Sequence, residues 1–150
     1  LKVIGDILVG EYSASDTEIL AANTERSQFS QSVYDKKKQF TIDRAGTVRV
    51  DFEMYLAGPG SATNGYLPGS VDVRKNGVSQ QTFSSSSNSY EAKQDSSLTV
   101  SAGDTVELWV RGGSRWVSGD STLEGRATYI RNATISADIA LTTGGDVDTD

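Results

Sequence analysis

The stretch TVRVDFEMYL, from Thr47 to Leu56, alternates strictly between apolar and polar side chains. Successive side chains of a β-strand point to opposite faces, so this period of two predicts a strand with one buried face and one outward face. The inner face is expected to hold Val48, Val50, Phe52 and Met54, and the outer face Arg49, Asp51, Glu53 and Tyr55.

Shorter runs of the same kind recur on both sides of this strand, separated by turns that contain glycine. Asn76-Gly77 suits the positive φ angles of a type I′ turn, and it predicts a hairpin between Ser70–Arg74 and Val78–Phe83. In Thr105–Arg111, Val106, Leu108 and Val110 are expected inside, and Glu107, Trp109 and Arg111 outside. The other predicted strands are Gln39–Asp43, Leu98–Val100 and Ala127–Leu141, the last with Ala133, Ile135, Ala137 and Ile139 on one face.

Three segments read as connections. Ala57–Gly69 contains four glycines and both prolines, so it is predicted to be a long loop. Gly112–Gly125 is predicted to be a second long loop, which carries Trp116, and Ser84–Ser89 a polar connector. The N-terminal section is less regular. Val3-Ile4 and Ile7–Val9 resemble an interrupted strand, whereas Thr17–Ala22 and Ser27–Tyr34 fit a strand or a short helix equally well.

These elements predict a single all-β domain, an antiparallel two-layer β-sandwich of jelly-roll type. A chain of 150 residues can bury enough surface to fold without a disulfide or a metal. The tail 142–150 is acidic and rich in glycine, and it is expected to be flexible.

The composition narrows the function. The chain has no cysteine and no histidine, which excludes a thiol nucleophile, a Ser-His-Asp triad, a Cys/His zinc site and an imidazole base. A hydrolase that uses only Asp and Glu is the enzymatic alternative left, and it ranks third, behind an interface and a glycan-binding role. The favoured expectation is no catalytic residues, no metal and no cofactor. The net charge of −6 makes nucleic acid and anionic membranes poor partners, and Lys36–Lys38 is interpreted as a solvated strand end.

Two sets of carboxylates are better explained without a catalytic or metal site. Asp51 and Glu53 share the outer face of one strand with Arg49, where cross-strand ion pairs are expected. The spacing of Asp146, Asp148 and Asp150 begins like a calcium loop, but the later glycine and glutamate that such a loop requires are missing.

Four aromatic residues are candidates for binding. Tyr55 and Trp109 are expected on outer strand faces, and Tyr66 and Trp116 in the two long loops. Aromatic side chains in such places anchor protein interfaces or stack on sugar rings. An interface is the favoured interpretation, because spacing alone does not establish the planar cluster that a sugar site requires.

Three segments in order carry a resemblance to a known family. They are IDRAGTVRVDF from Ile42 to Phe52, VRKNGV from Val73 to Val78, and LTVSAGDTVEL from Leu98 to Leu108. Together with the closing YIRN from Tyr129, they resemble the jelly-roll module of virion proteins of tailed bacteriophages, including capsid decoration proteins and tail or fibre components. The resemblance covers residues 38–141 and leaves 1–37 as an arm that packs on the domain or on a neighbouring subunit.

The resemblance implies a structural or adhesive role, often in a homotrimer, with no catalytic residues. The expected function is a capsid decoration or head-stabilising protein of a virion assembled in the host cytoplasm, bound to the capsid or to other virion proteins. The alternative is a receptor- or carbohydrate-binding module at a tail tip or fibre, which would bind a glycan through the loops Ala57–Gly69 and Gly112–Gly125.

Overall fold

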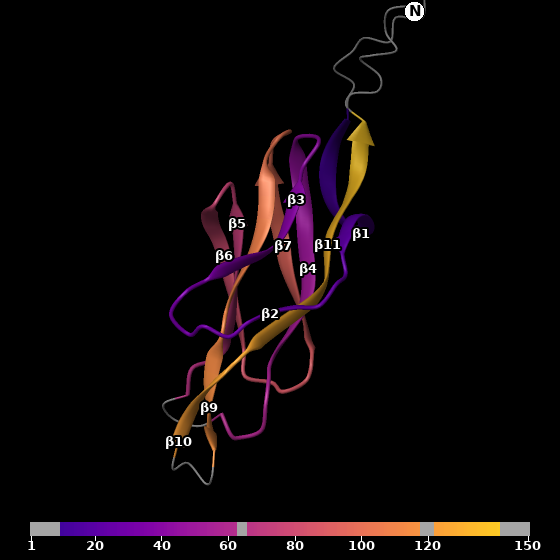
Figure 1. Cartoon of the computed structure of the whole chain (residues 1–150). Coiled ribbons are helices and arrows are strands. Elements are labelled where there is room, and N and C mark those ends of the chain that lie inside the picture. The colour runs from indigo at the N-terminus through magenta and orange to yellow at the C-terminus, as the bar shows by residue number, and fades with distance from the viewer. Residues whose placement is uncertain (1–9, 63–65, 118–121, 142–150) are drawn as a thin grey trace, which may run out of the picture.

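The computed structural model describes residues 10–62, 66–117 and 122–141, and these residues form strands and no helix (Figure 1). The all-β prediction is therefore confirmed. In chain order the strands are β1 (Gly10–Ala22), β2 (Arg26–Gln28), β3 (Asp35–Thr41), β4 (Gly46–Leu56), β5 (Gly69–Lys75), β6 (Val78–Ser85), β7 (Glu91–Val100), β8 (Thr105–Arg111), β9 (Gly113–Val117), β10 (Thr122–Arg126) and β11 (Thr128–Leu141).

Two sheets face each other. One has the order β2-β11-β1-β4-β7 and the other the order β3-β8-β5-β6, while β9 and β10 form a separate hairpin. The chain crosses between the sheets from β2 to β3, β3 to β4, β4 to β5, β6 to β7 and β7 to β8, and it returns from β8 to β11 by way of the hairpin. This alternation is the wrapping of a jelly roll, and it confirms the predicted sandwich.

The core lies between the sheets, and the predicted inner faces are confirmed. On β4, Val48, Val50 and Met54 are completely buried and Phe52 is 2% exposed. On β8, Val106, Leu108 and Val110 are completely buried as well. Burying each large apolar side chain contributes about 1.5–3 kcal/mol, so these two rows alone supply much of the force that holds the sheets together.

The first described strand belongs to the same core. β1 pairs antiparallel with β11 along its length, from Gly10 opposite Leu141 to Ala22 opposite Ala133. Tyr12 packs into the core, and its hydroxyl donates a hydrogen bond to the Asp43 carboxylate. Residues 17–22 are therefore strand, and residues 26–28 form the short strand β2 beside β11. The expected strand segments Val3-Ile4 and Ile7–Val9 lie outside the described residues, as does the tail 142–150.

A bulge in β11 adjusts its alternation. Ile130 and Ala133 are both completely buried although two residues lie between them, and in a regular strand residues i and i+3 point to opposite faces. Asn132 lies between them with φ +52°, and the register with β4 shifts between Arg131 and Thr134. The extra residue restores the inward direction for Ala133, Ile135 and Ala137, and it leaves Arg131 and Asn132 consecutive on the outer side. Ile139, expected on the same face, is 49% exposed.

The three turns that carry the family resemblance meet at one end of the sandwich. Asn76 and Gly77 have φ of +52° and +81°, which confirms the hairpin turn. The Asn76 side chain donates to Asp104 Oδ1 at 2.9 Å and accepts from the Thr105 amide at 2.9 Å, and the Ile42 amide donates to the Asp104 carbonyl at 2.8 Å. Gly46 adopts φ +134°, and a Cβ there would collide with the backbone of Tyr12.

Two predicted boundaries are wrong. Gly112–Gly125 is not one long loop, because Gly113–Val117 and Thr122–Arg126 pair as β9 and β10. β7 begins at Glu91, well before the expected Leu98. The inward positions of its first half carry Glu91 and Lys93, which lie opposite the buried Met54 and Phe52 at the edge of the sheet. Charged residues at inward positions hide a strand from an apolar pattern, although they are common at sheet edges.

The bulge gives a testable prediction about stability. Asn132→Val should lower the free energy of unfolding by about 1–2 kcal/mol, because a β-branched residue is strained at positive φ. Asn132→Gly should cost less, because glycine adopts this conformation readily. Urea unfolding of both variants measures the difference, and equal losses would show that the backbone conformation at residue 132 is unimportant.

The turn cluster gives a second prediction. Hydrogen bonds from the Asn76 side chain and the Ser101 amide lower the pKa of Asp104. A lowered pKa means that the carboxylate stabilises the fold above its unfolded pKa, near 4, and that this contribution is lost as the pH falls through the folded value. Asp104→Asn, which keeps only one acceptor, should therefore be less stable than the parent at pH 7, with the gap closing in acid. Asp138→Asn, at an exposed position, is the control for removing one negative charge.

Candidate functional site

The four aromatic candidates lie on three separate surfaces. Tyr55 is on the outer side of β4 and Trp109 on the outer side of β8, so the core separates them. We call these surfaces the β4 face and the β8 face. Trp116 lies in β9 and Tyr66 in the segment before β5, both at the end of the molecule that carries the β9–β10 hairpin, here called the hairpin end. No single surface holds all four candidates.

A row of three tyrosines crosses the β4 face. Tyr55 stacks on Tyr129, its neighbour in the register, with ring centroids 5.0 Å apart, and Tyr90 meets Tyr55 edge-on at 4.5 Å. The three rings are half-buried. Burial raises the pKa of the Tyr90 hydroxyl most, and the hydrogen bond to Glu25 raises it further. These rings are therefore engaged mainly with one another.

The next row on the β4 face is held by ion pairing. Arg131 Nε donates to Glu53 Oε1 at 2.6 Å, and the Arg131 guanidinium lies 3.8 Å from the Tyr90 ring centroid. Asn132, placed outward by the bulge, donates to the same carboxylate oxygen at 3.1 Å. Glu53 thus makes the cross-strand ion pair that the sequence predicts. A hollow of about 400 Å³ lies beside it, lined by Asp51, Phe52, Glu53, Ala92, Lys93, Gln94 and Asn132.

Trp109 on the β8 face is fixed in place by a buried acid. Its indole Nε1 donates to Glu107 Oε1 at 2.8 Å, and the guanidinium of Arg74 lies 4.3 Å above the ring centroid. Glu107 lies on the outer side of β8 as predicted, but the expectation that it is exposed is wrong, since only 6% of it is accessible. Burial would raise the pKa of Glu107, yet the hydrogen bonds from Thr105 and Trp109 and the nearby Lys36 lower it overall.

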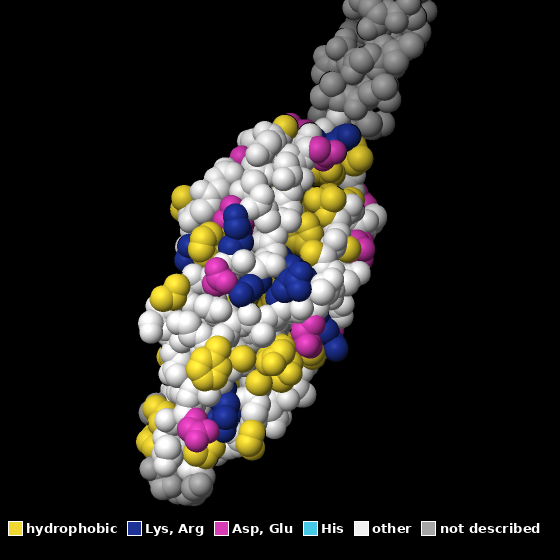
Figure 2. Space-filling model, in the orientation of Figure 1, with side chains coloured by type: hydrophobic (Ala, Val, Ile, Leu, Met, Phe, Trp, Pro, Cys, Tyr) yellow, Lys and Arg dark blue, Asp and Glu magenta, His cyan; other side chains and the backbone are white. Residues whose placement is uncertain are grey.

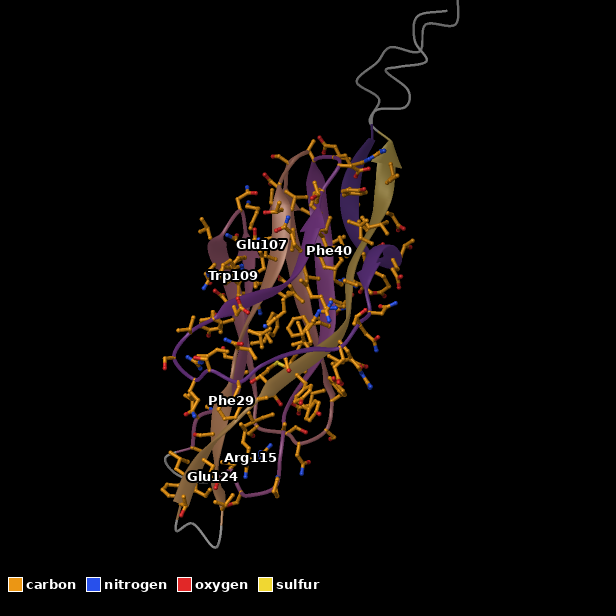
Figure 3. The ribbon with its side chains drawn as sticks, in the orientation of Figure 1. Phe29, Phe40, Glu107, Trp109, Arg115 and Glu124 are labelled. Atoms are coloured by element: carbon orange, nitrogen blue, oxygen red, sulfur yellow. The ribbon has the colours of Figure 1, made fainter. Side chains whose placement is uncertain are left out.

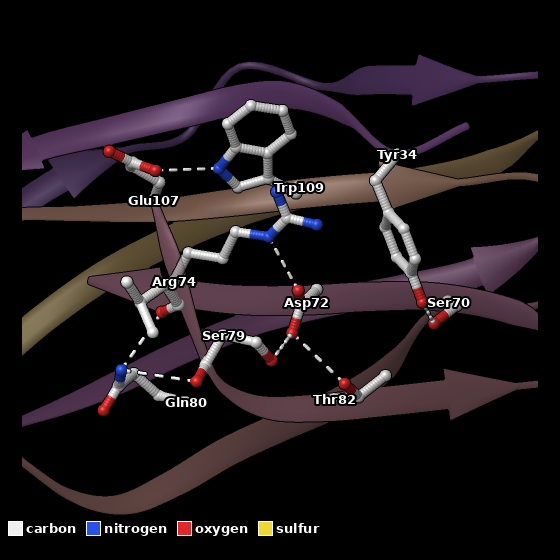
Figure 4. A network of polar contacts seen from close by, with 10 residues as sticks. Tyr34, Ser70, Asp72, Arg74, Ser79, Gln80, Thr82, Glu107 and Trp109 are labelled. Atoms are coloured by element: carbon white, nitrogen blue, oxygen red, sulfur yellow. Dashed lines mark hydrogen bonds and ion pairs between the residues drawn. The ribbon is translucent and has the colours of Figure 1, made fainter. Parts of the chain in front are cut away.

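A second buried acid fixes Arg74. Asp72 is 4% exposed and accepts from Arg74 Nε at 2.7 Å, from Ser79 Oγ at 2.6 Å and from Thr82 Oγ1 at 3.1 Å (Figure 4). The carboxylate is thus well satisfied. Two buried carboxylates under an outer face are unusual, and here each holds a large side chain in one orientation.

The hairpin end is tied to the sandwich by a buried arginine. Arg115 is 3% exposed, and it donates to the carbonyls of Leu56, at 2.9 Å, and Ser86. Burial, and then the nearby Arg126, lower its pKa, while Tyr66 opposes that shift. The adjacent Trp116 is bonded through its backbone to Ser61 in both directions, at 2.8 and 3.0 Å. Figure 3 shows Arg115 and Glu124 on this hairpin, and Glu107 and Trp109 farther along the molecule.

The sequence-based candidates omitted the most exposed apolar side chains near the hairpin end. Phe29 is 62% exposed and Leu123 43%, and Val33, in the segment between β2 and β3, is 58% exposed. Phe29 lies against Gly125, since a Cβ added to Gly125 would be 3.1 Å from the Cζ atom of Phe29. Leu123 is the register partner of Trp116. Figure 2 shows hydrophobic side chains gathered in this part of the surface. Lone apolar residues in segments expected to be irregular gave no periodic signal that could have identified them.

The described residues contain no group of three or more His, Cys, Asp or Glu arranged to hold a metal ion. In the same part of the chain there is no helix long and apolar enough to cross a membrane. No family model matches the sequence, and no curated protein matches it.

The pairing of Trp109 with Glu107 gives a third prediction. In a Trp116→Phe background, so that Trp109 is the one remaining tryptophan, Glu107→Gln should leave the fluorescence maximum unchanged because the amide oxygen still accepts from Nε1. Glu107→Leu should shift the fluorescence maximum and lower the free energy of unfolding by roughly 1 kcal/mol, because the indole loses its acceptor. Identical spectra for the two variants would contradict the assignment.

Proposed function

We propose that this chain is a non-enzymatic structural protein of a bacteriophage virion, most closely of the capsid decoration or head-stabilising type, acting through protein interfaces. The observation that supports this best is the group of exposed apolar side chains near the hairpin end, formed by Phe29 and Leu123 next to Trp116. Clustered exposed apolar residues in a protein surface mark contacts with other proteins.

The surroundings of this group are suited to an interface. The segment that carries Phe29 is held by a hydrogen bond from the Gly112 amide to the Ser30 carbonyl at 2.7 Å, and Arg115 anchors the neighbouring β9. Side chains on a fixed backbone lose little conformational entropy on binding, which favours affinity. Aromatic residues such as Phe29 and Trp116 are also the type that contributes most to interface energy.

The wider assignment follows from the family resemblance. The jelly-roll wrapping agrees with the module suggested by the three turn segments, and in that module assembly into a homotrimer on a capsid or with other virion proteins is common. We accordingly propose the virion as the location of the protein. The resemblance is an analogy at the level of the fold, so it supports the assignment through shared architecture and not through shared binding-site residues.

Replacing Phe29 and Leu123 together by serine tests the proposal. The parent should form an oligomer or co-sediment with capsids of the phage that encodes it, and the double variant should lose that association, because the apolar area that drives it is gone. The readouts are mass in solution by light scattering and co-sedimentation with capsids.

Val78→Ser is the matched control, since Val78 is 64% exposed but lies beside the Asn76-Gly77 turn. A parent protein that remains monomeric and ignores capsids would overturn the decoration role. A double variant that still associates would show that the hairpin end is not the surface through which the protein binds.

A further inference from the structure

Four side chains form a row across the β8 face. In order they are Trp109, Arg74, Tyr34 and Arg111, so aromatic rings alternate with guanidinium groups (Figure 4 shows the first three). The Arg74 guanidinium lies 4.3 Å from the Trp109 ring centroid and 5.6 Å from that of Tyr34, and the Arg111 guanidinium lies 5.2 Å from the Tyr34 centroid. Each guanidinium is attracted electrostatically to the face of the aromatic ring beside it, which stabilises the row.

Hydrogen bonds underneath hold three of the four in place. Glu107 fixes the Trp109 indole, Asp72 fixes Arg74 through Nε, and the Tyr34 hydroxyl is 2.6 Å from Ser70 Oγ. Both carboxylates are nearly inaccessible, so their role is to orient the row and not to meet a ligand. An array fixed in this way needs little reorganisation when something binds.

The guanidinium groups retain donors that the protein does not use. Among the described residues no carboxylate pairs with Arg111, and its terminal nitrogens, unlike its Nε, are not buried without a partner. Arg74 donates to Asp72 through Nε, and neither of its terminal nitrogens makes a hydrogen bond or ion pair to another of the described residues. Guanidinium groups bind carboxylates through pairs of parallel N–H donors, so two of them beside one ring favour an anionic ligand.

The acidic net charge of the chain does not oppose this. The exposed Asp16 and the half-buried Glu53 belong to the other sheet, where they pair with Arg49 and Arg131. Asp35, the exposed acid of β3, is the register partner of the inward-facing Val110 and pairs with Lys37. On the β8 face the acids are covered, and Lys36 adds a further cation 6.0 Å from the Trp109 ring centroid. The local field therefore differs in sign from the global one.

The surroundings of the row point to a sugar as the carrier of the anionic group. The adjoining edge strand β6 presents the exposed, uncharged side chains of Ser79, Gln80 and Thr82, and the hydroxyls of Ser79 and Thr82, which donate to Asp72, keep acceptor lone pairs. Trp109 and Tyr34 are half-buried and offer apolar ring surface beside the cations. We propose that the β8 face binds an acidic oligosaccharide, with Arg111 and Arg74 taking its carboxylates. This is a second surface, separate from the hairpin end and independent of the role proposed above.

The experiment uses a size-defined hyaluronan oligosaccharide, which carries a carboxylate on every second sugar, and the same oligosaccharide after reduction of its carboxyl groups. Titrations followed by amide NMR should show shifts centred on β5 and β8 with the acidic form and none with the reduced form. Arg111→Gln should weaken binding at least tenfold while leaving the spectrum of the free protein otherwise intact.

Arg44→Gln is the matched control, because Arg44 also lies over a tyrosine, Tyr12, at 5.6 Å, but outside the row. It should bind like the parent. No binding of hyaluronan by the parent, equal binding of the reduced form, or unchanged binding by Arg111→Gln would each overturn the proposal. Equal binding of dextran sulfate that survives Arg111→Gln would show attraction of any polyanion and would overturn it too.

Discussion

The apolar layer between the two sheets determines the rest of this molecule. β4 and β8 bury continuous rows of side chains, and the strict period of two then fixes which residues face outward on each strand. The bulge at Asn132 shows how strong this constraint is, since a residue is held at positive φ so that both Ile130 and Ala133 reach the core. The Tyr55 row and the Trp109 row are therefore consequences of core packing on opposite sides of the same layer.

Sequence periodicity correctly predicted the parts of the fold in which buried positions carry apolar residues and outward positions carry polar ones. Val48 to Met54 and Val106 to Val110 alternate cleanly because one face is apolar and the other is polar, and Asn76-Gly77 identified its turn by backbone conformation. β7 and the β9–β10 hairpin were missed because they violate the pattern. β7 has Glu91 and Lys93 at inward positions, and β9 buries Arg115, whose partners are backbone carbonyls far away in the sequence.

The candidate site was recovered only in part, for a related reason. Tyr55 and Trp109 could be placed on outer faces, but their partners come from other strands and depend on register, which the sequence of one strand does not contain. Glu107 illustrates this, because a position assigned to solvent is covered by Trp109 and its neighbours. Phe29 is the opposite case, an apolar residue in an irregular segment that remains exposed.

The β9–β10 hairpin has a consequence for how such a protein can diversify. It occupies the connection between β8 and β11. These strands lie in different sheets, so the connection has to run from one sheet to the other. The contacts that anchor it, among them those of Arg115, the Ser61–Trp116 bridge and the bond from the Ser114 amide to the Leu67 carbonyl, go mostly to backbone atoms. A lineage could replace the hairpin by another of different length and chemistry while the wrapping persists. The choice of binding partner would then change with the hairpin, while the sequence of the core changes at its own rate.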